Sequence, residues 1–266
     1  MEYVVITGGA SGMGRATALK LAENGYHVFS CDIKKNADEN ENITQLIVDV
    51  TNMESIKNAY EFVCSKTEKL SAVINFAGII MMNSLIEISE EEFIKIFNVN
   101  VFGAYRINKT FFPLIKNGKG RIIITTSEVA ENKVLPFNAI YGVSKKSLDA
   151  YAQGLTMELA FLDVPVITLR PGAVETPILN DSNKEMTELN KNTELYQNTI
   201  TKFKHIVDKE QGGSIKPERV ANLVLKILNK KNPKHVYKIN VSKKLKLLNA
   251  IPTKLQSKIF KRILRW

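Results

Sequence analysis

Three residues between positions 125 and 145 have side chains suited to moving a proton. Ser127 closes an apolar run, Tyr141 follows fourteen residues later, and Lys145 comes four residues after the tyrosine. Residues four apart lie on one face of a helix, so the phenol and the ammonium would be neighbours. Tyrosine has an ordinary pKa near 10, and an adjacent positive charge favours the phenolate. Such pairs also occur by chance in helices, so the elements around this one must decide whether it is catalytic.

A glycine-rich turn near the N-terminus supports a catalytic role. Residues 3–6 form an apolar, β-branched run, and Gly8, Gly12 and Gly14 follow at once, before a helical pattern that stops at Gly25. This order predicts a strand, a tight turn and a helix. Glycines let a pyrophosphate approach the N–H groups at the helix N-terminus, where the helix dipole favours negative charge. The segment therefore predicts a dinucleotide-binding turn.

The next segment indicates which dinucleotide is bound. Residues 27–33 read as a second strand with Asp32 near its end. A carboxylate there can accept hydrogen bonds from the adenosine ribose hydroxyls and would repel a 2′-phosphate, which favours NAD over NADP. Lys34 and Lys35 follow directly and could pair with a phosphate, so NADP stays open. Asp32 could also simply end a strand.

Apolar segments alternate with helical ones along the rest of the chain. We expect strands at 43–50, 71–78, 121–126, 165–172 and 235–240, and helices at about 53–66, 89–115, 138–162 and 217–230. This alternation predicts an α/β fold, a single doubly wound parallel sheet. Ligands bind beyond the carboxyl ends of the strands in such sheets. The predicted ends carry Asp32, Asp49, Asn75, Ser127 and the pair Pro171–Gly172, and we expect Asp49 to reach the adenine edge.

Two segments depart from simple alternation. Asn98 and Asn100 lie in the apolar middle of the helix expected at 89–115, where an amide is costly without partners. We expect Asn100 to be a site residue and leave Asn98 unassigned. Residues 178–215 are polar with weak periodicity and follow the sixth strand over the same crevice. They predict either a mobile substrate lid or a pair of solvated surface helices.

Composition limits the remaining possibilities. The chain has 266 residues, 44% of them hydrophobic, which suits one large domain. The two isolated cysteines, Cys31 and Cys64, favour a reducing cytoplasmic home, and the three scattered histidines argue against a metal site. We see no signal peptide and no membrane-spanning run. The net charge of +10 is concentrated at the end, because residues 241–266 carry eight basic and no acidic residues.

Taken together, the motifs resemble those of the short-chain dehydrogenase/reductase family over about residues 3–240. The matching motifs are TGGASGMG at 7–14, NFAG at 75–78, Asn100, Ser127, YGVSK at 141–145 and RPGAVETP at 170–177. The resemblance implies an NAD(P)-dependent oxidoreductase on a Rossmann sheet. It implies that Tyr141 is the general acid/base, that Lys145 binds the nicotinamide ribose and lowers the tyrosine pKa, and that Ser127 holds the substrate oxygen. Asn100 would fix a water in the proton relay, and Thr176 would contact the amide end of the cofactor.

These motifs also define the expected cofactor site. We expect contacts from Thr7, Gly8, Ser11, Gly12, Met13, Gly14, Asp32, Asp49, Val50, Asn75, Ala77, Gly78, Tyr141, Lys145, Pro171, Gly172, Val174 and Thr176. The chain departs from the family pattern at two points. The family pattern is Asn-Asn-Ala-Gly, and Phe76 replaces its second asparagine. Glu128 follows the serine, where the family usually has a small or apolar residue. If Glu128 faces the pocket, it alters the local charge or the choice of substrate.

Apolar segments flank the expected site on both sides. Residues 134–137 precede Tyr141, residues 79–82 follow the fourth strand, and both would line the pocket. They favour a bulky apolar alcohol or ketone, such as a hydroxysteroid. A 3-oxoacyl-carrier-protein reductase, another small carbonyl reductase or a polyol dehydrogenase remains open. A non-enzymatic NAD(H)-sensing protein is a further alternative, but such a protein would not need the complete set of proton-transfer residues.

The basic tail at 241–266 is expected to lie outside a Rossmann-fold domain formed by 1–240. Leu255, Ile259, Ile263 and Trp266 recur at helical spacing with cations between them. Such a segment could lie on an anionic membrane surface, pack against a subunit or form an ordinary solvated helix. No aromatic platform supports nucleic-acid binding. We therefore expect a cytoplasmic homodimer or homotetramer, with peripheral membrane contact as an additional possibility.

Overall fold

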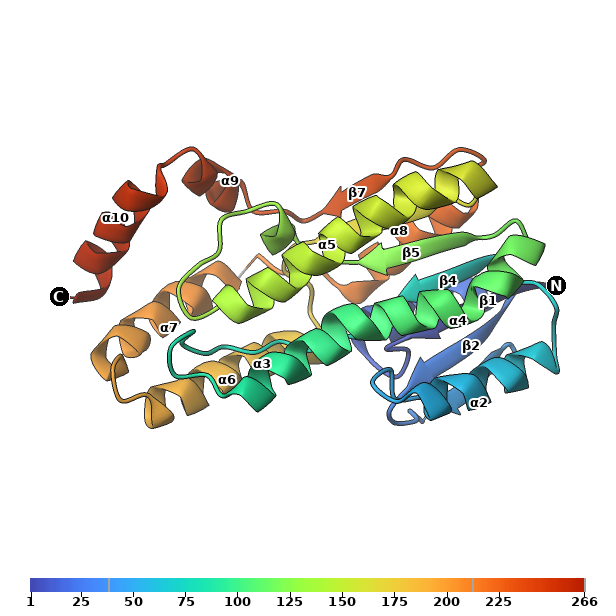
Figure 1. Ribbon diagram of the computed structural model, residues 1–266, viewed down its shortest axis with the longest axis horizontal. Helices are drawn as coiled ribbons and strands as arrows, with labels where there is room; N and C mark the ends of the chain where they lie inside the picture. The colour runs from blue at the N-terminus through green and yellow to red at the C-terminus, as the bar shows by residue number, and fades with distance from the viewer. Residues whose placement is uncertain (38, 212, 266) are drawn as a thin grey trace.

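Seven parallel strands form the centre of the molecule. The computed structural model describes residues 1–37, 39–211 and 213–265; Gly212, within the predicted segment 178–215, and Trp266, named in the predicted tail, lie outside the described residues. The sheet order is β3-β2-β1-β4-β5-β6-β7 (Figure 1). The strands are β1 (Glu2–Thr7), β2 (Tyr26–Asp32), β3 (Ile43–Ile47), β4 (Ala72–Asn75), β5 (Arg121–Thr125), β6 (Val166–Pro171) and β7 (Val236–Ile239). The predicted doubly wound α/β fold is confirmed.

The inner strands owe their position to continuous apolar runs. Residues 4–6 and 122–124 are buried on both faces of the sheet, as strands of a covered parallel sheet must be. Thr7 is paired with Cys31 on one side and with Asn75 on the other, so three strands end level with one another. The chain leaves β1 in one direction along the sheet and resumes at β4 in the other. This switch point places a crevice at the carboxyl ends.

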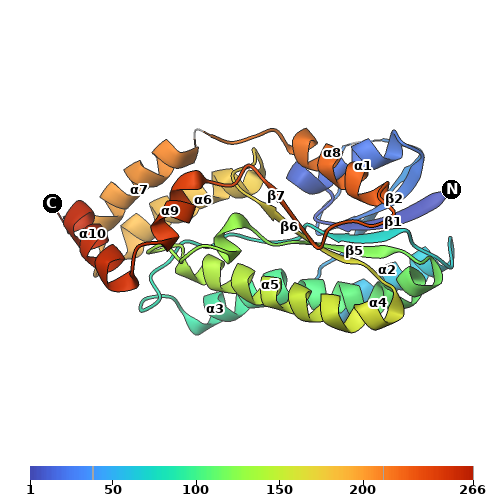
Figure 2. The same cartoon turned by 90° about the horizontal axis from the view of Figure 1, so that it is seen from above.

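Helices cover both faces of the sheet (Figure 2). One layer holds α2 (Met53–Cys64), α4 (Ala104–Asn117) and α5 (Ala139–Leu159), and the other holds α1 (Gly12–Ala22) and α8 (Pro217–Leu228). Each layer buries an apolar stripe against the strands. The two layers hold the strand ends, and therefore the crevice, in fixed positions.

Several predicted elements have different boundaries in the structure; β4, for example, ends at Asn75 rather than at residue 78. The helix expected at 89–115 begins at the Ser89 capping box as α3 (Glu90–Phe97), widens into a π-helical turn, η1 (Asn98–Gly103), and continues as α4. Local propensity does not reveal such a widening. Strand β3 ends at Ile47 rather than residue 50, because the Asp49 carboxylate accepts hydrogen bonds from the backbone and hydroxyl of Thr51 and turns the chain.

The polar segment 178–215 contains a pair of helices, α6 (Pro177–Asn192) and α7 (Gln197–Gln211). The pair is not simply solvated, because Met186, Leu189 and Phe203 are buried against the loop that precedes α5. Weak periodicity in the sequence conceals this narrow apolar stripe. The helix pair therefore forms one wall beside the strand ends.

The basic tail contains α9 (Lys243–Asn249) and α10 (Thr253–Arg265). Helix α10 lies against α7 (Figures 1 and 2) and packs through Gln256, Phe260 and Leu264, which recur every four residues. This buried face is not the apolar face that the sequence predicted. Leu255 and Ile263, which belong to the predicted face, remain about half exposed, at 49% and 52%. No helix in the described part of the chain is long and apolar enough to cross a membrane.

Candidate active site

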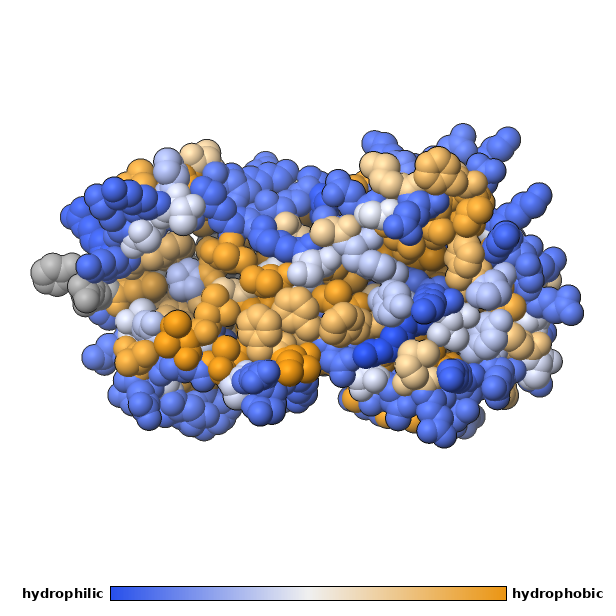
Figure 3. Space-filling model, viewed as in Figure 1, coloured by the Kyte–Doolittle hydropathy of each residue, from blue (hydrophilic) through white to orange (hydrophobic). Residues whose placement is uncertain are grey.

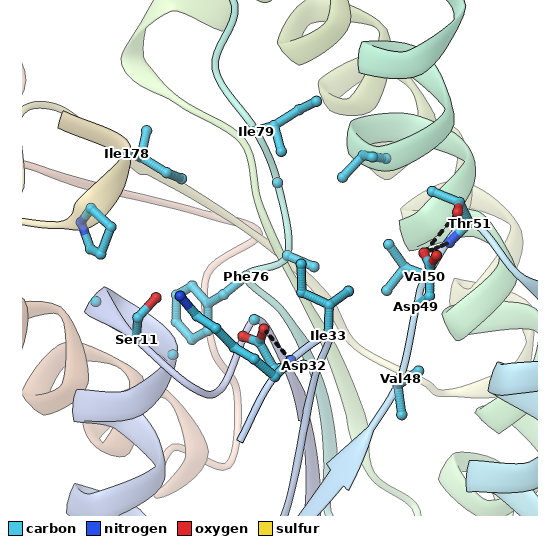
Figure 4. A pocket seen from close by; sticks show the side chains of 18 of the residues that line it. Ser11, Asp32, Ile33, Val48, Asp49, Val50, Thr51, Phe76, Ile79 and Ile178 are labelled. Atoms are coloured by element: carbon cyan, nitrogen blue, oxygen red, sulfur yellow. Dashed lines mark hydrogen bonds between the residues drawn. The ribbon is translucent and has the colours of Figure 1, made fainter. Parts of the chain in front are cut away.

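A cavity of about 850 Å³ opens at the carboxyl ends of β1, β2 and β4 (Figure 4). Of the predicted cofactor contacts, eleven line it: Gly8, Ser11, Gly12, Met13, Gly14, Asp32, Asp49, Val50, Ala77, Gly78 and Thr176. The sequence analysis did not name Ile33, Ile94 or Ile178, which also line the cavity. These three come from separate elements, so no local pattern marks them.

The glycine turn forms the floor of the cavity. A Cβ added at Gly14 would lie 2.1 Å from the carbonyl oxygen of Gly8, and Gly8 itself has a left-handed φ of +71°. A side chain at Gly14 would force the turn away from the first turn of α1, and one at Gly8 would collide with the backbone of Phe76 and Ala77 after β4. The turn thus leaves room for a diphosphate beside the helix N-terminus, and the structure fits the dinucleotide that the sequence predicts.

Asp32 is fixed at the rim of the cavity. Its Oδ2 accepts a hydrogen bond from the backbone N–H of Ala10 at 3.0 Å, and its Oδ1 accepts one from the N–H of Lys34 at 3.4 Å. Figure 4 shows the carboxylate beside Ile33 and Ser11, across the cavity from Asp49. A carboxylate held in this way presents negative charge where an adenosine ribose would lie.

Seven predicted contacts are absent from the cavity lining, namely Thr7, Asn75, Tyr141, Lys145, Pro171, Gly172 and Val174. Thr7 and Asn75 act from beneath instead. The Thr7 hydroxyl accepts a hydrogen bond from the N–H of Ala77 at 3.3 Å, and the Asn75 amide donates to Asn108 Oδ1 at 2.8 Å. Phe76, the first departure from the family pattern, is 8% exposed and borders the cavity as part of the core.

Lys145 and Tyr141 lie together next to this cavity, although neither belongs to its lining. A Cβ added at Gly78, a lining residue, would lie 3.4 Å from Lys145 Nζ. The Lys145 Nζ donates to the carbonyl of Thr125 at 3.2 Å and lies 5.8 Å from the centre of the Tyr141 ring. Lys145 is 6% exposed, and burial lowers its pKa to about 8. The spacing inferred from the sequence therefore does bring the two side chains together.

The pKa of Tyr141 differs from the sequence-based expectation. Burial raises it to about 12, a hydrogen bond with the Ser127 side chain lowers it, and the Glu128 carboxylate raises it. We expected Lys145 to lower this pKa, but desolvation of the phenolate outweighs an ammonium that itself loses charge readily when buried. The structure therefore places the Ser127 side chain near the Tyr141 phenol, and burial sets the direction of the shift in the phenol pKa.

Asn100 lies on the π-helical turn with its side chain fully engaged. Its Oδ1 accepts from the N–H of Ile79 at 2.8 Å, and its Nδ2 donates to the Ile79 carbonyl and to Ser144 Oγ, both at 3.0 Å. Both amide hydrogens are therefore occupied by protein acceptors. The side chain ties the loop after β4 to α5, a positioning task, and has no hydrogen left to donate to a relay water. The sequence did not predict a role for Ser144, because no motif marks it as a hydrogen-bond partner of Asn100.

A partly buried ion pair anchors α5 behind Tyr141. Arg170 on β6 donates to Asp149 on α5 through Nε at 2.8 Å and Nη2 at 2.7 Å. The hydroxyl of Thr126, next to Ser127, donates to the same carboxylate at 3.1 Å. The helix that carries Tyr141 and Lys145 is thus fixed to the strand end that carries Ser127. Among the described residues, no group of histidine, cysteine and carboxylate side chains could hold a metal ion.

The chain is similar to proteins of known class over most of its length. The sequence model described as short chain dehydrogenase matches residues 2–187. A 3-ketodihydrosphingosine reductase from Bacteroides thetaiotaomicron is 28% identical over 87% of this chain and 85% of its own, and human retinol dehydrogenase 16 is 28% identical over 66% and 58%. An alcohol dehydrogenase from the archaeon Thermococcus sibiricus, solved with 5-hydroxy-NADP, superposes with a TM-score of 0.70 at 25% identity, covering 90% and 96%.

The buried ammonium predicts a specific dependence of stability on pH. The ordinary lysine pKa is 10.5 and that of folded Lys145 is about 8, so between these values the unfolded chain binds more protons and the free energy of unfolding rises with pH. We expect wild type to gain about 2 kcal/mol relative to Lys145→Met between about pH 7.5 and about pH 9.5, with Tyr141 still protonated in both states.

Urea denaturation followed by circular dichroism measures this difference. Lys57→Met, at an exposed lysine on α2, is the matched control. The difference in the free energy of unfolding between wild type and Lys57→Met should stay constant over the same pH range. A constant offset between wild type and Lys145→Met across the pH range would contradict the lowered pKa.

Proposed function

We propose that this chain, which belongs to the short-chain dehydrogenase family and is an NAD(P)-dependent oxidoreductase, interconverts a ketone and a secondary alcohol on a bulky apolar substrate. The observation that carries the proposal is the proximity of Ser127, Tyr141 and Lys145 to one another, beside Gly78 in the lining of the dinucleotide-sized cavity. No residue in this group needs to move far to act together on one oxygen atom.

The roles follow from the chemistry of each group. A bound nicotinamide supplies or accepts the hydride. Tyr141 donates a proton to the carbonyl oxygen during reduction and takes it back during oxidation, while the Ser127 hydroxyl holds the same oxygen. Lys145 lies within reach of the phenol and beside Gly78, where a nicotinamide ribose would sit.

The walls beyond Tyr141 support an apolar substrate. Ile79, Met81 and Ile140 form one cluster with the tyrosine, and Met82 and Phe137 form a second with α6 and α7. Ile178 and Asp181 at the start of α6 line the cavity, which supports a lid role for 178–215. We propose a hydroxysteroid or a molecule of similar bulk. The relatives named for 3-ketodihydrosphingosine and for retinol also point toward largely hydrocarbon substrates.

Turnover of a substrate panel tests the reaction and the role of Tyr141 together. We expect steroid, retinoid or long-chain ketone substrates to exceed acyl thioesters and sugars in kcat/KM. Tyr141→Phe should lower kcat by about 10²- to 10⁴-fold, the usual worth of general acid–base catalysis, and should leave NADH binding within about twofold by fluorescence titration. Tyr105→Phe, at an exposed tyrosine on α4, is the matched control. Near wild-type turnover by Tyr141→Phe would overturn the assignment.

We propose NAD as the preferred cofactor, because the fixed carboxylate of Asp32 would repel a 2′-phosphate. Asp32→Asn keeps an oxygen that can accept from the N–H of Ala10 and removes only the charge. Two like charges at about 4 Å repel by about 1 to 4 kcal/mol in a wet site, so the ratio of kcat/KM for NADP to that for NAD should rise at least about tenfold. Asp163→Asn, far from the cavity, is the control. An unchanged ratio would count against Asp32 as the selecting residue.

The expected homodimer or homotetramer stays a prediction, and one face of the molecule supports it. Apolar side chains gather on the face in Figure 3 over α3 and α5. Phe102 and Tyr105 are 49% and 42% exposed, and Phe161, just beyond α5, is 89% exposed. Aromatic residues this exposed are typical of surfaces that bind another subunit.

We further propose that the protein is cytoplasmic and contacts anionic membranes through α9 and α10. Leu247, Leu255 and Ile263 are 71%, 49% and 52% exposed between the lysines of the tail. We expect the wild-type protein to pellet with phosphatidylserine vesicles at low salt and less at high salt, since cations near an anionic surface add about 1 kcal/mol each. Leu255→Ser/Ile263→Ser should pellet less, whereas Leu162→Ser, at another exposed leucine, should not. Equal pelleting of all three proteins would refute the contact.

A further inference from the structure

The loop between Ser127 and Tyr141 rests on the C-terminal tail. Glu128, the second departure from the family pattern, turns toward the start of α9 rather than into the cavity. Its Oε2 accepts a hydrogen bond from the backbone N–H of Ser242 at 2.5 Å, and Ser242 in turn caps α9. The residue that follows the proposed catalytic serine is therefore held by a residue that lies outside the matched family segment 2–187.

Asn249, at the end of α9, holds the same loop at a second place. Its Nδ2 donates to Asn132 Oδ1 at 2.7 Å, and its Oδ1 accepts from the N–H of Lys133 at 2.8 Å. The Lys133 ammonium donates to the carbonyl of Ile251 at 2.5 Å. Asn132 is 4% exposed and donates to the Glu128 carbonyl at 2.8 Å, which links the two places.

The remainder of the loop meets α10 through apolar contact. Phe137 belongs to the same buried cluster as Leu264, and Phe260 packs against that cluster. Gln256 donates to the carbonyl of Leu248, which joins α10 to α9. The tail thus contacts the loop along its length, with polar groups near Ser127 and apolar groups near Tyr141.

We propose that the C-terminal segment 242–264 is part of the active site and that Asn249 is a positioning residue, which holds the loop between Ser127 and Tyr141 in the place where the organic substrate binds. The inference rests on the proposed function in one respect, namely that this loop forms a wall of the substrate site. Asn249 forms hydrogen bonds with the side chain of Asn132 and with the backbone N–H of Lys133, both in this loop. Replacing Asn249 by alanine would remove both hydrogen bonds. Nothing in this arrangement touches the glycine turn or Asp32.

Two measurements on the full chain test the proposal. In Asn249→Ala, the backbone amides at 129–133 should exchange hydrogen about tenfold faster or more, because the loop loses the hydrogen bonds that Asn249 makes. Exchange at 7–14 should stay unchanged. With the best substrate of the panel, KM should rise about tenfold or more and kcat should fall less, while the Kd for NADH stays within about twofold. A merely structural role would lower thermal stability without moving KM.

Matched variants complete the experiment. Asn117→Ala removes an exposed asparagine that donates to Glu68 on the far side of the molecule, and it should match wild type in both measurements. Glu128→Ala should loosen the loop, and Glu128→Gln should restore most of its protection, because the glutamine oxygen can still accept from Ser242. Wild-type exchange in Asn249→Ala, or faster exchange with unchanged KM and kcat, would overturn the proposal. If wild type turns over no substrate, the proposed function fails, and the exchange measurement alone decides whether the tail holds the loop.

Discussion

The burial of an ammonium group beside a phenol is the constraint on which the arrangement of this site depends. Lys145 is almost fully enclosed, and a buried cation is costly unless polar groups face it. The carbonyl of Thr125 accepts one of its hydrogens, and Gly78 approaches so closely that an added Cβ would lie 3.4 Å from the ammonium and 3.1 Å from Asn100 Oδ1. The neighbouring strand ends must therefore be placed to within a fraction of an ångström, and the parallel sheet with its two helical layers does this.

The polar groups around this pair form a continuous framework. Asn100 fastens the loop after β4 to Ser144 on α5, and Asp149 fastens α5 to Arg170 and Thr126. The Asn100 contacts join α5, which carries Tyr141, to the loop that lines the cavity, and the Asp149 contacts join α5 to the strand end that carries Ser127. The framework explains why the hydroxyls of Ser127 and Tyr141 meet, although they come from a strand end and a helix. It also explains the π-helical turn, because widening the helix at Asn100 lets one amide reach both the loop and α5.

The two departures from the family pattern have structural explanations of different kinds. Phe76 replaces an asparagine of the family pattern, and its ring packs in the core beside the cavity. Glu128 exchanges a small residue for a carboxylate that reaches out of the site to the N-terminus of α9, where negative charge is favoured. The basic tail thus has two faces with different tasks: one packs against α7 and the loop before α5, and the other exposes leucine and isoleucine between lysines.

The sequence by itself determined the α/β fold, the order of strand, glycine turn and helix, and the adjacency of Tyr141 and Lys145. These features depend on short-range spacing, in which a period of 3.6 or an apolar run decides the outcome. It also located Asp32 at a strand end, because the strand pattern stops there.

Only the tertiary structure decided the ionisation of Tyr141, the partners of Asn100 and the direction of Glu128, because each depends on atoms that are distant in sequence. The pKa of Tyr141 is set by burial among several elements, which no spacing rule can supply. The packed face of α10 was likewise decided by α7, since Leu255, Ile259 and Ile263 and the set Gln256, Phe260 and Leu264 have the same helical spacing. Periodicity identifies an amphipathic helix, but the neighbour against which it packs selects the face that is buried.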